Sequence, residues 1–407
     1  MTKGNSSSYQ GCPAAEVDYR LDRPIFWNYE SLNSLRRLGD VTWNSACQGY
    51  WMLNGYDVAK EALRMDEVFT NRKVNAFQPD MELRLLPQNL GGEEHKKLRS
   101  LLNPWFSPGS VKRMDAVSRS LAGKLIDAVK PRGSCDFVTD FGILYPTEIF
   151  LTLLGLPVKD GPTFVEWVEA IFGGFHSVDQ TAANHAANAV RSYFEAVVAD
   201  RLANKRDPAQ DFVSYLIQAD AGGDLLPHED VVTICLTIML AGLDTTRSAL
   251  GYILHHLADH DEDRRRMLDP DFAQRAIEEF LRLYSLLIQD GRYVDRDIDF
   301  HGCPMKAGDV ISVGIISANR DPMKFDRPDE FYPERGSNPH LAFGLGPHRC
   351  LGMHLARREL SIALEEWHSR IPNYRIRPGS ELVERGGQLA LKSLPLEWDT
   401  TSIDMFP

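Results

Sequence analysis

Apolar residues recur at the spacing of an α-helix along much of this chain. In residues 107–129 they include Val111, Met114 and Leu121, which fall on one face of a helix. The same periodicity predicts further helices over residues 184–202, 229–260, 272–284 and 351–371. The segment 229–260 is apolar on nearly every side in its first half, which is typical of a helix buried in a large protein or in a membrane.

The apolar segments do not predict a membrane protein. The most apolar stretch, residues 231–243, is shorter than the roughly 20 residues that a bilayer requires, and it contains two threonines. The polar residues 1–24 lack the apolar core of a signal peptide or an anchor. We therefore expect a cytoplasmic protein that makes no contact with a membrane.

Strand-like segments are short and lie late in the chain, at residues 309–315 and as two segments within 389–398. Between them, residues 321–349 are rich in proline and glycine, and an irregular run of this length is usually functional. No linker divides the chain. We expect one mainly helical domain with small sheets over residues 1–407, of which residues 1–20 form a flexible N-terminus.

Composition narrows the possible functions. Hydrophobic residues make up 43% of the 407 residues, enough for a sizeable core. The 45 basic and 57 acidic residues give a net charge of −12, which argues against nucleic-acid binding. Six scattered cysteines form no CxxC pair, so neither a disulfide framework nor a zinc site is indicated. Five of them are interpreted as small buried hydrophobic residues.

The sixth, Cys350, follows a glycine-rich loop and precedes a predicted helix. Gly344 and Gly346 allow positive φ and let the backbone pass close to a flat ligand. A thiolate at a helix N-terminus is favoured by the helix dipole. Two alternatives remain: an incidental cysteine after a glycine loop, and a phosphate-binding loop, although the Gly-Lys-Ser/Thr ending of such loops is missing.

A second unusual segment lies in the middle of the long apolar helix. Gly242, Asp244, Thr245 and Thr246 are poor choices for a buried helix interior. An acid and a hydroxyl that face a cavity could pass protons to bound dioxygen. The alternative is a helix that becomes exposed to solvent at Asp244.

The cysteine loop resembles the haem-binding signature of the cytochrome P450 family, Phe-x-x-Gly-x-[His/Arg]-x-Cys-x-Gly, at every defined position. The resemblance implies the mainly α cytochrome P450 fold, with haem b between the long central helix and this loop. Cys350 would be the axial thiolate ligand of the iron, which favours O–O bond cleavage. The other cofactor-binding residues implied here are Phe343, Gly344, Gly346 and Gly352.

The central helix is similar to the oxygen-activation motif of the same family, [Ala/Gly]-Gly-x-[Asp/Glu]-Thr-[Thr/Ser]. By this resemblance Thr245 would stabilise the activated dioxygen by hydrogen bonding, and Asp244 would control proton delivery. Gly242 would leave room for dioxygen, and Ala241 would contact the haem.

Four cationic side chains match positions that hold the haem propionates in the family, namely His95, Arg99, Arg292 and His348. Acidic groups in an apolar site require such donors. From the residues alone, His95 and Arg99 would instead be interpreted as a solvated basic face. The resemblance further implies a buried structural set of Glu279, Arg282 and Arg335.

The chain after Arg282 is similar to the camphor-hydroxylase branch, in which an aspartate at the position of Asp290 helps to control access. Family topology predicts a largely apolar substrate pocket, although each residue could equally be ordinary core. The predicted pocket residues are Phe77, Leu86, Phe172, Phe175, Leu240, Leu287, Ile288, Gln388 and Leu389.

We therefore expect a monooxygenase that uses O2 and hydroxylates a small to medium apolar molecule, terpenoid-like in the first instance and a steroid or fatty acid in the second. Neither flavin nor NAD(P)H would be bound by this chain, so electrons would come from NAD(P)H through a reductase and a 2Fe-2S ferredoxin. The ferredoxin would dock on Lys96, Lys97, Arg99, Arg349 and Arg357. The chain would be a monomer. Alternatives are a peroxide-driven peroxygenase and a haem-binding sensor.

Overall fold

The computed structural model describes residues 11–72, 75–78, 84–174, 177, 179–219 and 225–400. Its contacts divide the chain into two compact units. Unit 1 comprises Met1–Lys96, Glu279–Cys350 and Glu384–Leu389, and unit 2 comprises Lys97–Glu278, Leu351–Val383 and Ala390–Pro407. Three elements run across these boundaries: α3 (Gly92–Leu102), α12 (Pro270–Leu283) and β12 (Val383–Arg385). That the whole chain folds as a single domain stays a prediction.

Unit 1 is built on a six-stranded sheet with the order β1-β3-β4-β10-β7-β5. Neighbouring strands are antiparallel except for β1 with β3 and β4 with β10. Strand β4 is buried along its whole length, which explains its continuous run of apolar residues. The strand bounds are β1 (Ala14–Ala15), β3 (Val41–Asn44), β4 (Tyr50–Leu53), β5 (Phe69–Thr70), β7 (Gly291–Val294) and β10 (Val310–Val313).

Short helices and a hairpin complete unit 1. The hydrophobic core includes Trp51, Phe69 and Ile311 from the sheet, each fully buried. Buried Glu384 accepts hydrogen bonds from the backbone nitrogens of Phe26 and Asn28 and thereby satisfies donors at the start of α1. The remaining elements are β2 (Arg23–Pro24), α1 (Trp27–Leu38), α2 (Tyr56–Ala62), β8 (Ile298–Phe300), β9 (Cys303–Met305) and α13 (Ile315–Asn319).

One interpretation of the cysteines is wrong. Cys12 and Cys303 form a disulfide that joins the segment before β1 to β9, with 6.0 Å between their Cα atoms. The two residues are 291 positions apart, so no local spacing could have indicated the pair. Cys135 and Cys235 are buried as expected, and Cys47 is partly buried.

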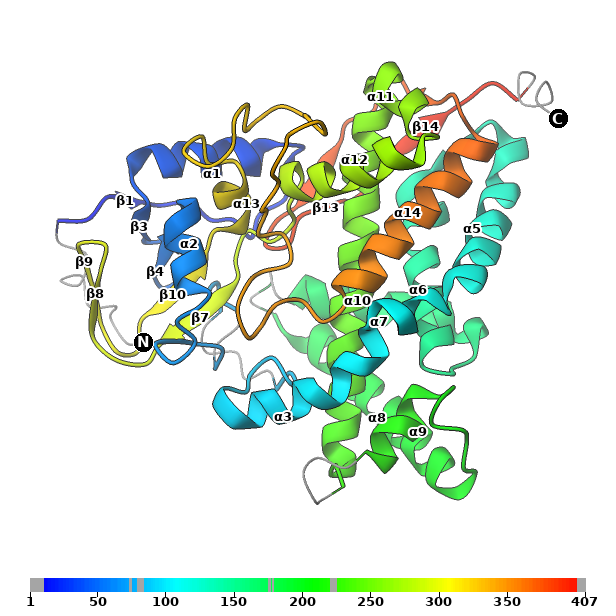
Figure 1. Cartoon of the computed structure of the whole chain (residues 1–407), viewed down its shortest axis with the longest axis horizontal. Helices are drawn as coiled ribbons and strands as arrows, with labels where there is room; N and C mark the ends of the chain where they lie inside the picture. The colour runs from blue at the N-terminus through cyan, green and yellow to red at the C-terminus, as the bar shows by residue number, and fades with distance from the viewer. Residues whose placement is uncertain are drawn as a thin grey trace. The chain divides into compact units, whose positions relative to one another are not determined.

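Unit 2 is mainly helical. Its longest helix, α10 (His228–Asp259), packs against α6, α8 and α14, and α5 lies beside α14 (Figure 1). The other helices are α4 (Pro108–Lys112), α5 (Asp115–Val129), α6 (Leu144–Leu153), α7 (Gly161–Gly174), α8 (Thr181–Ala203), α9 (Phe212–Gln218), α11 (Asp261–Arg266) and α14 (Met353–Arg370). Short 3-10 turns are Asn103–Phe106, Lys130–Arg132 and Val158–Asp160, and Val138–Gly142 is a π-helical turn.

The strands of unit 2 are β6 (Ser134–Asp136), β11 (Arg375–Ile376), β13 (Ala390–Leu391) and β14 (Pro395–Glu397). Strand β14 lies between β11 and β6 in an antiparallel sheet. The two late strands predicted from the sequence therefore exist as β13 and β14, but they belong to different sheets.

Within the described residues, one helix is long and apolar enough to cross a membrane, and this helix is α10. Its most apolar window is 78% buried inside the protein, as is typical of a core helix. The helix is therefore only weak evidence for a membrane span.

Candidate functional site

The loop before Cys350 is shaped by its glycines. The backbone nitrogen of Cys350 donates to the oxygen of Phe343 at 2.9 Å, and Gly344 N donates to Leu341 O at 2.8 Å. Gly344 and Gly346 have φ of +63° and +73°, which favours glycine at both positions. Cys350 is exposed and forms no disulfide.

The same glycines leave room beside the loop. A Cβ atom placed at Gly344 would meet no other atom within 4 Å, whereas one at Gly346 would clash with the backbone oxygen of Leu63. Gly346 thus fits the loop against the end of α2, and Gly344 faces open space. The open space at Gly344 is compatible with a flat ligand beside the loop.

Three of the predicted propionate ligands belong to unit 1. The rings of His95 and His348 lie 4.0 Å apart, and His95 is buried. Arg292, on β7, is also buried and donates to both carboxylate oxygens of Asp290 and to the oxygen of Gly291. The fourth, Arg99, lies one turn after His95 on α3. The structure therefore brings His95 and His348 together and pairs Arg292 with Asp290.

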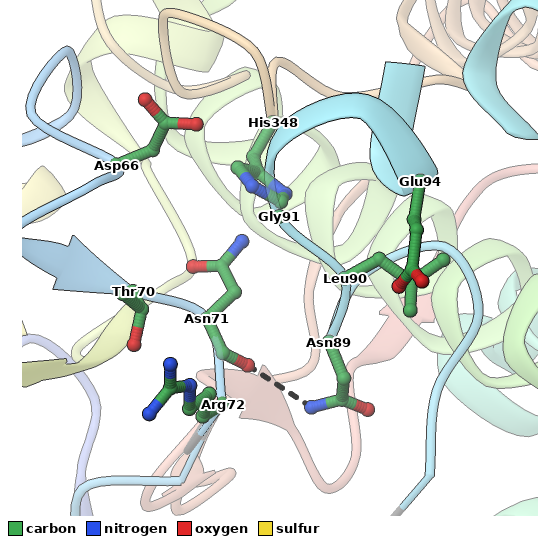
Figure 2. Close-up of a pocket in the computed structure, with 9 residues that line it drawn as sticks. All are labelled: Asp66, Thr70, Asn71, Arg72, Asn89, Leu90, Gly91, Glu94 and His348. Carbon is green, nitrogen blue, oxygen red and sulfur yellow. Dashed lines mark hydrogen bonds between the residues drawn. The ribbon is translucent and has the colours of Figure 1, made fainter. Parts of the chain in front are cut away.

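His348 also lines a polar cavity of about 340 Å³ in unit 1 (Figure 2). The other lining residues are Asp66, Thr70, Asn71, Arg72, Asn89, Leu90, Gly91 and Glu94. Asn71 is only 4% exposed, and neither atom of its side-chain amide has a hydrogen-bond partner among the residues that the structure describes. A buried amide without partners, beside a predicted propionate ligand, fits the carboxylate chemistry of a haem edge.

In unit 2, the middle of α10 opens on one side. Ala241 and Gly242 are exposed and Thr245 is partly exposed, although most of the helix is buried. These positions share a face of the helix. The Thr245 hydroxyl donates to the oxygen of Ala241 at 2.8 Å, a bond within the helix that leaves its lone pairs available. A Cβ atom at Gly242 would meet nothing within 4 Å.

Asp244 lies behind this face and is buried. Its Oδ1 is 3.8 Å from the Arg247 guanidinium, which also forms an ion pair with Glu169 of α7. The Glu169 side chain is 47% exposed, so the three residues connect the buried carboxylate to the surface. The sequence did not indicate Glu169 or Arg247, because neither belongs to a recognised motif.

A second buried acid of unit 2 was also missed. Glu359, on α14, hydrogen-bonds to the side chain of Thr246, the neighbour of Thr245. Burial raises the pKa of the Glu359 carboxyl to about 8, and the bond from Thr246 lowers it slightly. Glu359 is therefore a buried acid with a raised pKa next to the α10 motif.

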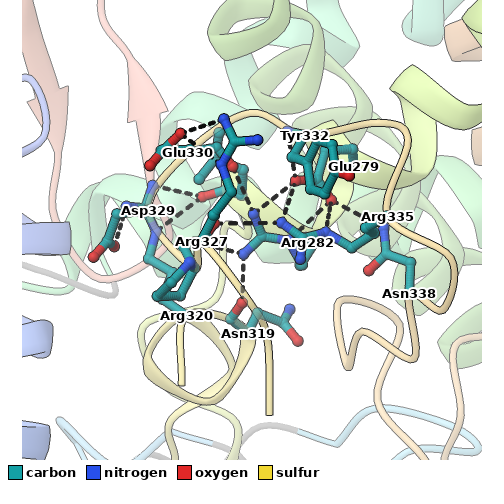
Figure 3. Close-up of polar contacts among 12 residues, drawn as sticks. Glu279, Arg282, Asn319, Arg320, Arg327, Asp329, Glu330, Tyr332, Arg335 and Asn338 are labelled. Atoms are coloured by element: carbon teal, nitrogen blue, oxygen red, sulfur yellow. Dashed lines mark hydrogen bonds and ion pairs between the residues drawn. The ribbon is translucent and has the colours of Figure 1, made fainter. Parts of the chain in front are cut away.

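Glu279, Arg282 and Arg335 are brought together in unit 1 (Figure 3). The Glu279 carboxylate accepts six hydrogen bonds, of which Arg282 and Arg335 each supply two. Tyr332 N and Asn338 Nδ2 supply the others. Burial raises the pKa of Glu279, but the two arginines more than offset this and hold it below its ordinary value. The network anchors the irregular chain that leads to Cys350.

The predicted substrate residues fall into two groups. In unit 1, two predicted segments, residues 287–288 and 388–389, lie side by side. Leu287 and Gln388 form an antiparallel β-bridge, and Leu389 N donates a hydrogen bond to Leu286 O at 2.9 Å. A third segment, which contains Phe77, is joined to them because Ala76 N donates a hydrogen bond to Gln289 Oε1 at 2.8 Å. Phe77, Leu86, Ile288 and Leu389 are buried, as are Phe172 and Leu240 in unit 2. Phe175 lies outside the described residues.

Comparison with known proteins places the chain in a family. The model of the cytochrome P450 family matches residues 39–269 and 269–370. A probable cytochrome P450 127A1 from Sinorhizobium fredii (strain NBRC 101917 / NGR234) is 34% identical over 86% of this chain and 84% of its own length. A steroid C26-monooxygenase from Mycobacterium tuberculosis (strain CDC 1551 / Oshkosh) is 32% identical over 79% of this chain and 86% of its own.

A solved structure, that of CYP101J2, is 28% identical and superposes with a TM-score of 0.88 over 98% of this chain and 100% of its own. The chain belongs to the cytochrome P450 family, and it has the family's fold. It is accordingly a monooxygenase, an oxidoreductase whose family implies a haem iron with a thiolate ligand and dioxygen.

Proposed function

We propose that this cytochrome P450 hydroxylates a small to medium apolar molecule, terpenoid-like in the first instance, with a haem b whose iron is ligated by Cys350. The observation that carries the proposal is the exposed Cys350 at the end of a loop shaped by the positive φ of Gly344 and Gly346. When bound, the haem supplies dioxygen activation. His95, His348, Arg292 and Arg99 would hold its propionates.

The residues of α10 would handle protons. Thr245 is on the partly exposed side of α10 and its hydroxyl donates to Ala241 O, so its Oγ1 would accept a hydrogen bond on that side and hold a proton. Asp244 would control proton delivery, and its contact with Arg247, which pairs with the exposed carboxylate of Glu169, would hold it in position. Gly242 would keep the space beside Thr245 open.

The substrate class rests on the apolar side chains. Phe77, Leu86 and Leu389 would bind an apolar molecule by burial. The resemblance of residues 285–292 to the camphor-hydroxylase branch favours a terpenoid. The name of the steroid C26-monooxygenase favours a steroid as the second candidate.

Electrons would come from NAD(P)H and would reach this chain through a reductase and a 2Fe-2S ferredoxin. The protein would be cytoplasmic and monomeric. Some of the predicted docking residues already form ion pairs. Lys96 contacts Glu93 at 2.6 Å, and Arg357 binds Glu278 through two hydrogen bonds of 2.6 and 2.8 Å. The docking surface would therefore depend more on Lys97 and Arg349 than on these two side chains.

The test is an optical titration of the ferric protein with terpenoids, steroids and fatty acids. We expect a low-to-high-spin shift of the haem band with terpenoids, followed by hydroxylated product with NADH, a surrogate ferredoxin and its reductase. A spin shift with steroids alone would contradict the terpenoid assignment. Product with peroxide but not with ferredoxin would contradict the monooxygenase proposal and favour a peroxygenase.

A further inference from the structure

Asn71 has a side chain that the proposed chemistry does not yet use. It is almost completely buried, and both atoms of its amide lack a hydrogen-bond partner within the described parts of the chain. A buried polar group without a partner costs roughly 1–3 kcal/mol, so such groups generally serve a ligand, an ion or water. Figure 2 shows the amide directed into the polar cavity, towards His348.

The position of Asn71 is fixed by its neighbours. Strand β5 pairs with β7 in the register Phe69↔Val294 and Thr70↔Tyr293. Asn71 directly follows β5, in a turn. Asn89 donates to the backbone oxygen of Asn71 at 3.1 Å and thereby fixes the backbone there.

The ligand chemistry follows from the donors around the amide. His348 lines the same cavity. Gly91, directly before α3, and Glu94, in its first turn, border the cavity, and a helix start presents backbone N–H groups. Arg72 also lines it, paired with Asp295 at 3.0 Å. Such a set of donors suits a carboxylate.

The source of the carboxylate follows from the acidic side chains at the same cavity. Asp66 and Glu94 line it too, and their charges oppose the entry of a free anion from solvent. A carboxylate that belongs to a cofactor already bound through another contact has a high effective concentration at the cavity. It can therefore bind there despite the repulsion from Asp66 and Glu94. We propose that the Asn71 amide donates a hydrogen bond to a haem propionate beside His348. This inference rests on the proposed binding of haem by Cys350.

The test measures the rate at which haem leaves the ferric protein to an excess of apomyoglobin. Asn71→Leu keeps the volume of the side chain and removes the donor. Losing a hydrogen bond to a charged group is expected to accelerate haem loss about ten- to a hundredfold. Thr70→Val is the matched control, since Thr70 lines the same cavity but donates to Tyr293 O at 3.4 Å. The rate of haem loss from this control variant should stay within about twofold of the rate from the unaltered protein.

The decisive comparison uses haem dimethyl ester, whose propionates carry no charge. With this cofactor, Asn71→Leu should change the rate by less than about threefold. An equal acceleration with both cofactors would overturn the proposal, because the side chain would then act by packing. An unchanged rate with native haem would also overturn it. Saturable acetate binding to the haem-loaded protein that Asn71→Leu abolishes, without faster haem loss, would assign the site to a free carboxylate instead.

The two proposals fail in different ways. If the unaltered protein lacks a thiolate-haem spectrum, the proposed function fails. If that spectrum is present in the unaltered protein and in Asn71→Leu, and haem loss is equally slow in both, only the role of Asn71 fails.

Discussion

Glu279 offers a sharp test of how the irregular chain before Cys350 is held. Its side chain and that of Arg282 are fully buried, and the side chain of Arg335 is 6% exposed. Each carboxylate oxygen of Glu279 accepts three hydrogen bonds, one of them from each arginine. In Glu279→Gln, an NH2 group replaces one of these oxygens in either orientation. Three bonds and the negative charge are therefore lost.

The expected cost is large because two buried guanidinium groups remain without a counter-charge. Breaking a buried ion pair by removing one partner typically costs about 3–5 kcal/mol. The adjacent Glu278→Gln is the matched control. The Glu278 side chain is 32% exposed and that of Arg357 is 27% exposed, so this substitution should cost at most about 1 kcal/mol.

Urea unfolding followed by circular dichroism, at equal haem loading, measures both variants against the unaltered protein. We expect a much lower urea midpoint for Glu279→Gln than for Glu278→Gln. Equal midpoints for the two variants would refute the reasoning that burial makes the Glu279 network stabilising.

Three further predictions address the site. Thr245→Ala should release peroxide in place of product, because its proton-holding hydroxyl is lost; an unchanged ratio of product to NADH consumed would contradict this. Gly346→Ala should lower the melting temperature of the haem-free protein, since its Cβ would clash with the oxygen of Leu63 at positive φ; a matched Gly344→Ala, whose Cβ meets no protein atom, should lower it less. Ionising buried Glu359 disfavours the folded state, so stability should fall as pH rises from about 4.5 to 8, by up to about 5 kcal/mol. Glu359→Gln should remove this fall, and equal pH profiles would contradict the raised pKa.

The long elements could be predicted from the sequence, because their periodicity extends over many turns. The prediction for residues 229–260 agrees with α10 (His228–Asp259) to within one residue at each end. The prediction for 107–129 missed a break, since the structure has α4 and then α5, separated at Arg113 and Met114. Apolar spacing continues through this break, so periodicity could not reveal it.

The sequence could indicate the motif residues because they have a characteristic spacing along the chain, as in the cysteine loop and the α10 segment. The sequence did not indicate the polar residues that lie near these motifs in space. Asn71, Glu169 and Glu359 are single polar residues whose importance depends on what they approach in space. The same holds for Cys12 and Cys303. Such contacts join distant parts of the chain, and a single sequence carries no signal for them.

The central claim, that Cys350 is the thiolate ligand of a haem iron, is tested most directly by the ferrous–carbon monoxide spectrum of Cys350→His. This variant retains a potential iron ligand, so haem can remain bound. We predict that the Soret band typical of thiolate ligation is present in the unaltered protein and in Cys47→Ala, and is lost in Cys350→His. A thiolate band that persists in Cys350→His would contradict the account.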